Sequence, residues 1–273
     1  AEAVSMKVIE YAIGLALKHE ADPQDDIIGA LLKGKDTEKG LTHDEFCWFF
    51  LLLIAAGNES TRTVTSHGMR LLMENPDQLE YLVQNPDKII NAVDEMIRYN
   101  TAFIMMRRQA MEDVEVGGQV IKKGDKIILH YHTVNHDENV FGEDAMPFDV
   151  RRAERITELY NEHRSFAIVQ HFCIGSHLAR LELNIMMEEI IPRLRNPTFQ
   201  GDPNFVRSYF ANSMNEMLIT FDPEMAGCRA ACSPGPPGAP GVRISLSRRA
   251  QVTSSPLRSW SSWSLRAMAS SKS

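Results

Sequence analysis

Cys173 lies in a segment whose residue types suit a protected thiolate. The run from Phe166 to Arg180 holds this single cysteine, with Gly175 two residues later and helical spacing after it. At a helix N-terminus, unsatisfied backbone N–H groups and the helix dipole favour a thiolate over a thiol. Gly175 lacks a Cβ, so its backbone can approach the sulfur and donate to it. A lone thiolate suits one large soft acceptor, the iron of haem; the alternative is a small buried hydrophobic residue ahead of a helix.

Glu95 and Arg98 form a second candidate pair. Positions i and i+3 share one face of a helix, so the carboxylate can hold the guanidinium through a bidentate, charge-assisted contact. Such pairs are also common on solvated helix faces. Glu95 and Arg98 therefore gain weight only from their order and spacing relative to Cys173.

A third segment combines an acid with alcohols inside an apolar helix. Gly57 follows the apolar run from Phe46 to Ala56 and precedes Glu59, Ser60 and Thr61. Hydroxyl side chains can bond back to the previous turn and bend a helix, and such bends cluster at functional sites. We expect an interruption of the helix here; a helix C-terminus at Gly57 is the alternative.

In this order and spacing, the segments resemble the cytochrome P-450 superfamily of haem-thiolate monooxygenases, in its soluble bacterial form. The family's haem loop, F-G-x-G-x-H/R-x-C-x-G followed by L-A-R, is matched by seven residues: Phe166, His171, Cys173, Gly175, Leu178, Ala179 and Arg180. Ala167 and Val169 replace the two loop glycines. Val169 is the larger departure, because a β-branched residue is poorly suited to positive φ.

The resemblance implies a role for each matched residue. Cys173 would ligate the iron of haem b, and the E-x-x-R pair would lock the core with a third cation, Arg152. Ala56 and Gly57 would border the dioxygen groove. Glu59 would be the acid that delivers protons, with Ser60 as its alcohol and Thr61 next to it. The remaining implied residues are cofactor-binding (Arg108 and His171 at the propionates, Phe166 and Gly175 in the loop) or line the substrate pocket (Thr101, Ala102, Phe103, Ile104).

The fold expected from this resemblance is mainly α with small β-sheets (α+β), the C-terminal portion of the cytochrome P-450 fold. Residues 1–226 would form this partial domain, with the family's N-terminal half missing. Residues 227–273 are rich in Ser, Pro, Gly and Arg without acidic residues, which predicts a disordered tail. The tail is interpreted as a product of read-through or a shifted frame, or alternatively as a basic interaction arm.

Local patterns predict where the elements lie. Four helix starts are expected: at Asp22-Pro23, at a capping box over 42–45, at Asn75-Pro76 and at Asn85-Pro86. Short strands, broken at Gly117-Gly118 and at Gly124, are expected between Val114 and Tyr131. The helix after the loop should bury one face (Leu178, Leu181, Ile185, Ile190). A closing hairpin is expected over 205–221, with residues 211–213 near its tip.

Composition narrows the partners. A net charge of −7 argues against a general nucleic-acid binder. The four cysteines do not form a disulfide framework, which favours a reducing cytoplasm. No run of about 18 apolar residues is present, so no membrane anchor is seen.

The resemblance implies insertion of one oxygen atom from O2 into a hydrophobic small molecule: a terpenoid, a steroid or a fatty chain. No dinucleotide-binding or flavin motif is present, so electrons would come from a separate donor of the ferredoxin type. Its basic docking face would lie around Arg151, Arg152, Arg155 and Arg164, with a solvated charged patch as the alternative. One alternative is a zinc-stabilised binding module built from His163, His171, Cys173 and His177. Another is a fragment of the family that lacks independent activity.

Overall fold

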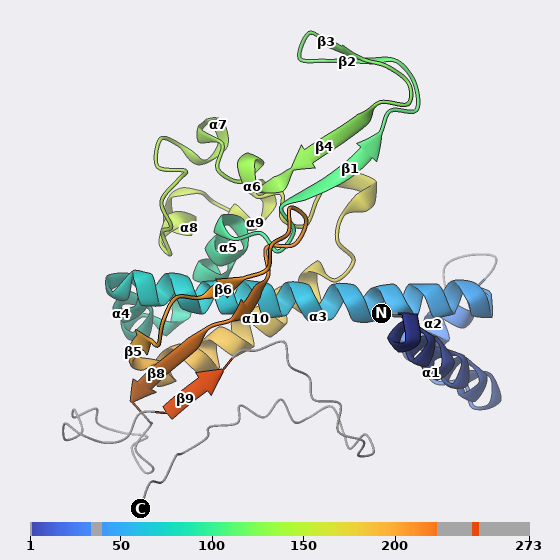
Figure 1. Cartoon of the computed structure of the whole chain (residues 1–273), viewed down its shortest axis with the longest axis horizontal. Coiled ribbons are helices and arrows are strands. Elements are labelled where there is room, and N and C mark those ends of the chain that lie inside the picture. Colours follow the sequence, from blue (N-terminus) through green and yellow to red (C-terminus); the bar gives the residue numbers. More distant parts are fainter. Residues whose placement is uncertain (1, 34–39, 223–241, 246–273) are drawn as a thin grey trace, which may run out of the picture. The chain divides into compact units, whose positions relative to one another are not determined.

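The computed structural model describes residues 2–33, 40–222 and 242–245 (Figure 1). These residues form two compact units, one ending at Glu59 and the other beginning at Ser60. Helices dominate both units and the strands form small sheets, so the predicted fold class is confirmed. Among the described residues, no helix is both long and apolar enough to cross a membrane.

The first unit contains α1 (Glu2–Ala21), α2 (Ile27–Lys33) and the beginning of α3 (His43–Glu74). Its core consists of Ala12, Ala16, Phe46 and Cys47. The predicted helix start at Asp22-Pro23 is wrong, because α2 begins only at Ile27. Asp26 supplies the capping acceptor instead, since its Oδ1 lies 2.8 Å from the backbone nitrogen of Gly29.

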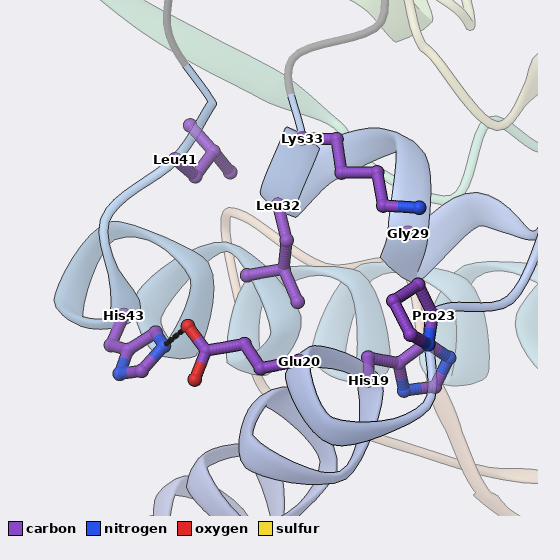
Figure 2. Close-up of a pocket in the computed structure, with 8 residues that line it drawn as sticks. All are labelled: His19, Glu20, Pro23, Gly29, Leu32, Lys33, Leu41 and His43. Carbon is purple, nitrogen blue, oxygen red and sulfur yellow. Dashed lines mark hydrogen bonds and ion pairs between the residues drawn. The ribbon is translucent and has the colours of Figure 1, made fainter.

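A pocket of about 220 Å³ lies in this unit (Figure 2). An ion pair crosses it, with His43 Nε2 2.7 Å from Glu20 Oε1. His19 and Lys33 also contribute to its lining. The pocket includes none of the predicted site residues.

The long helix α3 begins with the predicted capping box. The Thr42 backbone nitrogen donates to Glu45 Oε2 at 2.9 Å, and the Glu45 nitrogen donates to Thr42 Oγ1 at 3.3 Å. The predicted interruption at Gly57 is absent, because α3 is α-helical from His43 to Glu74. Thr65 Oγ1 bonds back to the Thr61 carbonyl at 2.9 Å, so a hydroxyl can bond to the previous turn without breaking the helix.

The core of the second unit lies between α3, α4 (Pro76–Gln84), α5 (Ile89–Tyr99) and α10 (Ser176–Ile190). A Cβ built at Gly68 of α3 would lie 2.6 Å from Met96 Sδ and 2.9 Å from Met187 Cε. Glycine therefore permits α3 to approach both α5 and α10 closely. The starts predicted at Asn75-Pro76 and Asn85-Pro86 are confirmed, the second through the short 3₁₀ helix η1 (Pro86–Lys88).

Two antiparallel pairs of strands follow α5: β1 (Met105–Gln109) with β4 (Lys126–His130), and β2 (Val114–Val116) with β3 (Gln119–Ile121). The predicted strands and their breaks at Gly117-Gly118 and Gly124 are confirmed, whereas β1 was not predicted. The stretch from there to the cysteine is largely irregular. Its short helical turns are α6 (Tyr131–Val134), α7 (Glu138–Phe141), α8 (Arg152–Arg155), α9 (Leu159–Glu162) and η2 (Val169–His171).

The last described strands lie beyond α10 and the 3₁₀ turn η3 (Ile191–Arg193). β6 (Asn204–Phe205) pairs with β7 (Met214–Glu216), which confirms part of the expected hairpin. The other half differs: β8 (Leu218–Asp222) lies between β5 (Arg195–Phe199) and β9 (Val242–Ser245). β9 corrects the prediction of disorder for its four residues; the rest of the predicted tail from 227 lies outside the described residues.

The predicted buried face of α10 is wrong for three of its four residues. Leu178, Leu181 and Ile185 are exposed, whereas the buried apolar residues of this helix are Leu183 and Met187. The helix therefore packs with a face rotated from the expected one. The exposed apolar stripe begins immediately after the loop that carries Cys173.

Candidate active site

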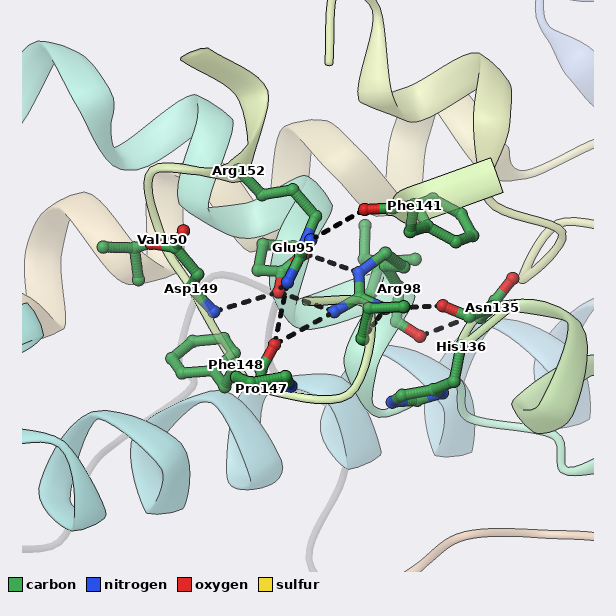
Figure 3. A network of polar contacts seen from close by, with 12 residues as sticks. Glu95, Arg98, Asn135, His136, Phe141, Pro147, Phe148, Asp149, Val150 and Arg152 are labelled. Atoms are coloured by element: carbon green, nitrogen blue, oxygen red, sulfur yellow. Dashed lines mark hydrogen bonds and ion pairs between the residues drawn. The ribbon is translucent and has the colours of Figure 1, made fainter. Parts of the chain in front are cut away.

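Glu95, Arg98 and Arg152 form a buried ionic cluster, as predicted (Figure 3). Glu95 Oε2 lies 2.6 Å from Arg98 Nε, and its Oε1 lies 2.8 Å from Arg98 Nη2. Arg152, from α8, approaches the same carboxylate with its Nε 3.1 Å from Oε2. All three side chains have no exposed surface. Buried charges of this kind are tolerated only when they are paired and fully hydrogen-bonded.

The arginines also bind the irregular segment between α6 and α8. Arg98 Nη1 donates to the carbonyl oxygens of Asn135 and Ala145, the latter at 3.0 Å. Arg152 Nη2 donates to the carbonyl oxygens of Asp144 at 2.7 Å and Pro147 at 2.9 Å. The cluster therefore holds this irregular segment through its backbone carbonyl oxygens.

Asn135 extends the cluster to the loop, and no local sequence pattern marks this residue. This fully buried residue accepts from the Arg164 backbone nitrogen at 2.7 Å and donates to Ser165 Oγ at 2.7 Å. Ser165 Oγ in turn donates to the Ile97 carbonyl of α5 at 2.8 Å. The chain is thereby fixed immediately before Phe166, the first residue of the predicted haem loop.

Cys173 is exposed and carries a free thiol. Its backbone nitrogen donates to the Phe166 carbonyl at 2.9 Å, and its carbonyl accepts from Ser176, the first residue of α10, at 3.2 Å. The predicted position of the thiol just ahead of a helix is therefore confirmed. A Cβ at Gly175 would lie 4.0 Å from the sulfur, an ordinary contact, so the spacing alone does not require glycine there.

Ala167 and Val169 have φ angles of 61° and 48°. Both residues therefore occupy the left-handed region at the positions where the family has glycine, and Val169 does so with a β-branched side chain. The loop adopts a glycine-type backbone without the glycines. The sequence predicted an unfavourable backbone conformation at Val169, and the positive φ lies at that residue.

The thiol is surrounded by exposed apolar side chains. Val169 is 82% exposed, Ile174 is 78% exposed and Phe172 is 53% exposed. Phe166 lies behind them, its ring 6.5 Å from that of Phe172. A soft donor on an apolar, preformed loop fits a large flat hydrophobic group with a metal ion at its centre, so these residues fit haem.

His163, one of the four residues of the zinc hypothesis, is buried behind the loop. Its ring lies 5.8 Å from that of Phe166, and neither ring nitrogen has a hydrogen-bond partner. Burial, and to a smaller extent the positive charges of Arg180, Arg164 and Arg98, together lower the pKa of His163 to about 3. The histidine is therefore neutral across the physiological pH range.

The predicted oxygen-handling residues follow one another along α3, across the point where the two units divide. Ala56 and Gly57 are exposed, Glu59 and Ser60 are half-buried, and Thr61 is buried.

The predicted substrate-pocket segment lies beside the loop between β6 and β7. The Ile104 nitrogen donates to the Phe210 carbonyl at 2.8 Å, and the Asn212 nitrogen donates to the Ala102 carbonyl at 2.9 Å. Thr101 is fully buried, with its hydroxyl 3.1 Å from the Phe103 carbonyl, so its side chain does not line an open surface.

The two predicted propionate partners are placed differently. Arg108 lies on β1, half-buried, and its Nη1 donates to the Arg107 carbonyl at 3.0 Å. His171 is exposed at the end of η2. No contact between the two side chains is recorded, and a bound carboxylate would have to bring them into one site.

The zinc hypothesis is not supported. In the part of the chain that the structure describes, no group of three or more His, Cys, Asp or Glu side chains is arranged to hold a metal ion. His163 is buried, whereas His171, Cys173 and His177 are exposed.

Comparison with known proteins agrees with this site. The chain matches the family "Cytochrome P450" over residues 4–205. It is 34% identical to a steroid C26-monooxygenase of Rhodococcus jostii, over 83% of this chain and 46% of that protein. It is 35% identical to a linalool 8-monooxygenase of Pseudomonas putida, over 75% of this chain and 48% of that protein.

A crystal structure from Bacillus megaterium, in complex with testosterone, superposes with a TM-score of 0.73 at 29% identity, covering 80% of this chain and 59% of the other. The chain belongs to the cytochrome P450 family. Members of this family bind haem b through a cysteine thiolate. The chain spans about half the length of the curated relatives that it matches.

Proposed function

We propose that this chain supplies the thiolate half of a haem-thiolate monooxygenase. The observation that carries the proposal is the loop from Phe166 to Gly175, which presents a free cysteine among exposed apolar residues and is fixed from behind by the Glu95 cluster. Cys173 would hold the iron, with Phe166 and Gly175 beside it. Arg108 and His171 would bind the propionates, because a guanidinium fork matches a carboxylate.

The bound haem, with a thiolate ligand, supplies the oxidation of the substrate by activated dioxygen. The chain's own residues would orient the cofactor and move protons. Glu59 would carry protons to the dioxygen site, and the hydroxyls of Ser60 and Thr61 would relay them, while Ala56 and Gly57 border that site. Glu95, Arg98 and Arg152 would act only by fixing the loop.

The substrate would be a hydrophobic small molecule that passes over Ala102, Phe103 and Ile104, with Thr101 buried beneath them. The two curated relatives are named for a steroid and for linalool, and the solved structure holds testosterone. A steroid, a terpenoid or a fatty chain is therefore the class to test first. Dioxygen is the second substrate, and the cytoplasmic location remains a prediction.

Electrons would come from a separate donor of the ferredoxin type. The basic docking face first expected around Arg151, Arg152, Arg155 and Arg164 needs correction. Arg152 is fully buried, and Arg155 Nη1 pairs with Asp149 at 2.6 Å. Arg151 stacks on the Tyr81 ring at 4.0 Å. These three arginines are engaged in contacts within the fold, so we do not propose them as the docking face.

The test is reconstitution of the purified chain with haem, followed by reduction and exposure to carbon monoxide. A red-shifted Soret band that is lost in Cys173→Ala is the expected result. The buried thiol variant Cys47→Ala is the matched control and should keep the band. A folded chain that takes up no haem, or an identical spectrum in Cys173→Ala, would overturn the proposal.

A further inference from the structure

Asp94 is a second buried acid on α5, next to Glu95 in sequence but paired with a different part of the chain. Its Oδ2 lies 2.7 Å from Arg180 Nη2 on α10. The Asp94 side chain is 9% exposed and the Arg180 side chain 24% exposed. Consecutive residues of α5 therefore hold two different segments, one before the Cys173 loop and one after it.

Arg180 also contacts a third element. Its guanidinium carbon lies 4.4 Å from the centroid of the Tyr160 ring on α9. A planar guanidinium can stack on an aromatic face and donate to a carboxylate at the same time, which an ammonium group cannot do in the same geometry. Arg180 thus connects α10 to both α5 and α9.

The carboxylate of Asp94 depends on this arginine. The other oxygen, Oδ1, is buried without a hydrogen-bond partner. Burial raises the pKa of Asp94, and the nearby charge and hydrogen bond of Arg180 oppose that rise. A carboxylate with one free oxygen and one arginine has no substitute donor if the arginine is removed.

Backbone hydrogen bonds connect the Asp94–Arg180 contact to Cys173. α10 begins at Ser176, whose nitrogen bonds to the Cys173 carbonyl at 3.2 Å, and the next turn is closed by the Ala179 nitrogen on the Gly175 carbonyl at 2.8 Å. Arg180 is the residue that follows this turn. Its position therefore sets where the first turn of α10, and with it the Cys173 backbone, can lie.

We propose that Arg180 and Asp94 are positioning residues for the Cys173 thiolate, holding the chain after the loop as Glu95 holds the chain before it. This inference rests on the proposed function only in that the thiolate binds haem. The positioning itself is a property of the haem-free chain, and it can be measured there.

The test compares Arg180→Gln, Asp94→Asn and the double variant in two measurements. The first is hydrogen exchange over residues 174–183 of the haem-free chain. The second is the fraction of the carbon monoxide complex that shows the red-shifted, thiolate-ligated band. Arg180→Gln should raise the exchange about tenfold and lower the thiolate-ligated fraction, because a charge-assisted contact is lost. Arg180→Lys should be intermediate.

The double variant separates positioning from stability. It removes the buried charge of Asp94 together with its partner, so its resistance to urea should be higher than that of Arg180→Gln, while fast exchange and a low thiolate-ligated fraction persist. Arg70→Gln is the matched control, because Arg70 makes a 2.6 Å ion pair with Glu74 inside α3 and contacts neither Asp94 nor Arg180 through a charge pair; it should change neither measurement.

Wild-type exchange over residues 174–183 in the double variant would overturn the inference. A normal thiolate-ligated fraction in that variant would also overturn it. If the wild-type chain shows no thiolate band at all, the proposed function fails, and the exchange measurement still decides the inference alone.

Discussion

The Glu95 cluster and the Cys173 loop are connected through Asn135 and Ser165, but their side chains differ in burial. In the cluster, three charged side chains are completely buried and share hydrogen bonds of 2.6–3.2 Å. In the loop, Val169 and Ile174 are 82% and 78% exposed, although both are apolar. Two loop residues also have positive φ without being glycine.

This difference separates a scaffold from a ligand-facing surface. The cluster satisfies its own polar groups and needs no further partner, as buried polar networks must. The loop is held in place by contacts from behind and leaves its apolar side uncovered. Strain that persists because surrounding structure imposes it is typical of binding sites. The loop therefore has the character of a surface that a cofactor completes.

The largest test of the comparison removes the central acid of the cluster. Glu95→Gln leaves Arg98 and Arg152 buried without their counter-charge, which should cost about 3–5 kcal/mol of unfolding free energy. Urea unfolding followed by circular dichroism measures this cost. Glu74→Gln removes an exposed acid from the Arg70 ion pair and should cost no more than about 1 kcal/mol. Equal costs for the two variants would show that the cluster is not the scaffold.

His163, behind the loop, gives the next effect through pH. Its pKa is lowered from 6.5 to about 3 in the folded chain. As the pH falls from 6.5 towards 3, the unfolded chain takes up a proton that the folded chain rejects. The contribution of His163 to the unfolding free energy should therefore be fully present above pH 6.5. The unfolding free energy should fall by up to about 1.4 kcal/mol per pH unit as the pH drops below 6.5.

His163→Leu should flatten this part of the stability profile, measured by urea unfolding between pH 4 and 7. His177→Gln, on the exposed start of α10, is the control and should leave the slope as it is in the wild type. An unchanged slope in His163→Leu would assign the acid sensitivity to other groups.

The smallest effect sharpens the description of the loop. Val169→Gly removes a β-branched side chain from φ 48°, which should relieve about 1–2 kcal/mol of strain, offset by about 0.5–1 kcal/mol of extra entropy in the unfolded chain. A net gain of about 0–1.5 kcal/mol is expected in urea unfolding. Ile168→Gly is the matched control, because Ile168 has an extended φ of −146° and should only lose stability. A loss in both variants would refute the strain.

Sequence reasoning identified the residues with strong local signatures. Cys173, the Glu95–Arg98 spacing and the capping box at Thr42 are each defined by a short pattern with a clear physical cause. The third cation, Arg152, was expected from the family resemblance. The left-handed backbone at Val169 was also expected, because the family's glycine marks a conformation that the loop requires whichever residue occupies it.

Long-range features were missed for a different reason. Asn135 and Ser165 connect positions separated by 30 residues, and Asp94 and Arg180 connect positions separated by 86. No local pattern marks such partners. The buried face of α10 was also assigned wrongly, since periodicity identifies apolar residues but does not reveal which of them a neighbouring helix covers. The predicted helix interruption at Gly57 was also wrong, because a glycine inside a long helix is tolerated when its neighbours remain helical.

The most direct test of the central claim is amide hydrogen exchange of the chain with and without haem. In both states, slow exchange is predicted for the α5 amides that carry the Glu95 cluster. Over residues 166–175, fast exchange is predicted without haem, and it should slow markedly when haem binds. Fast exchange of the α5 amides in the haem-free chain would contradict a preformed scaffold. Equal protection of the loop in both states would contradict a surface that the cofactor completes.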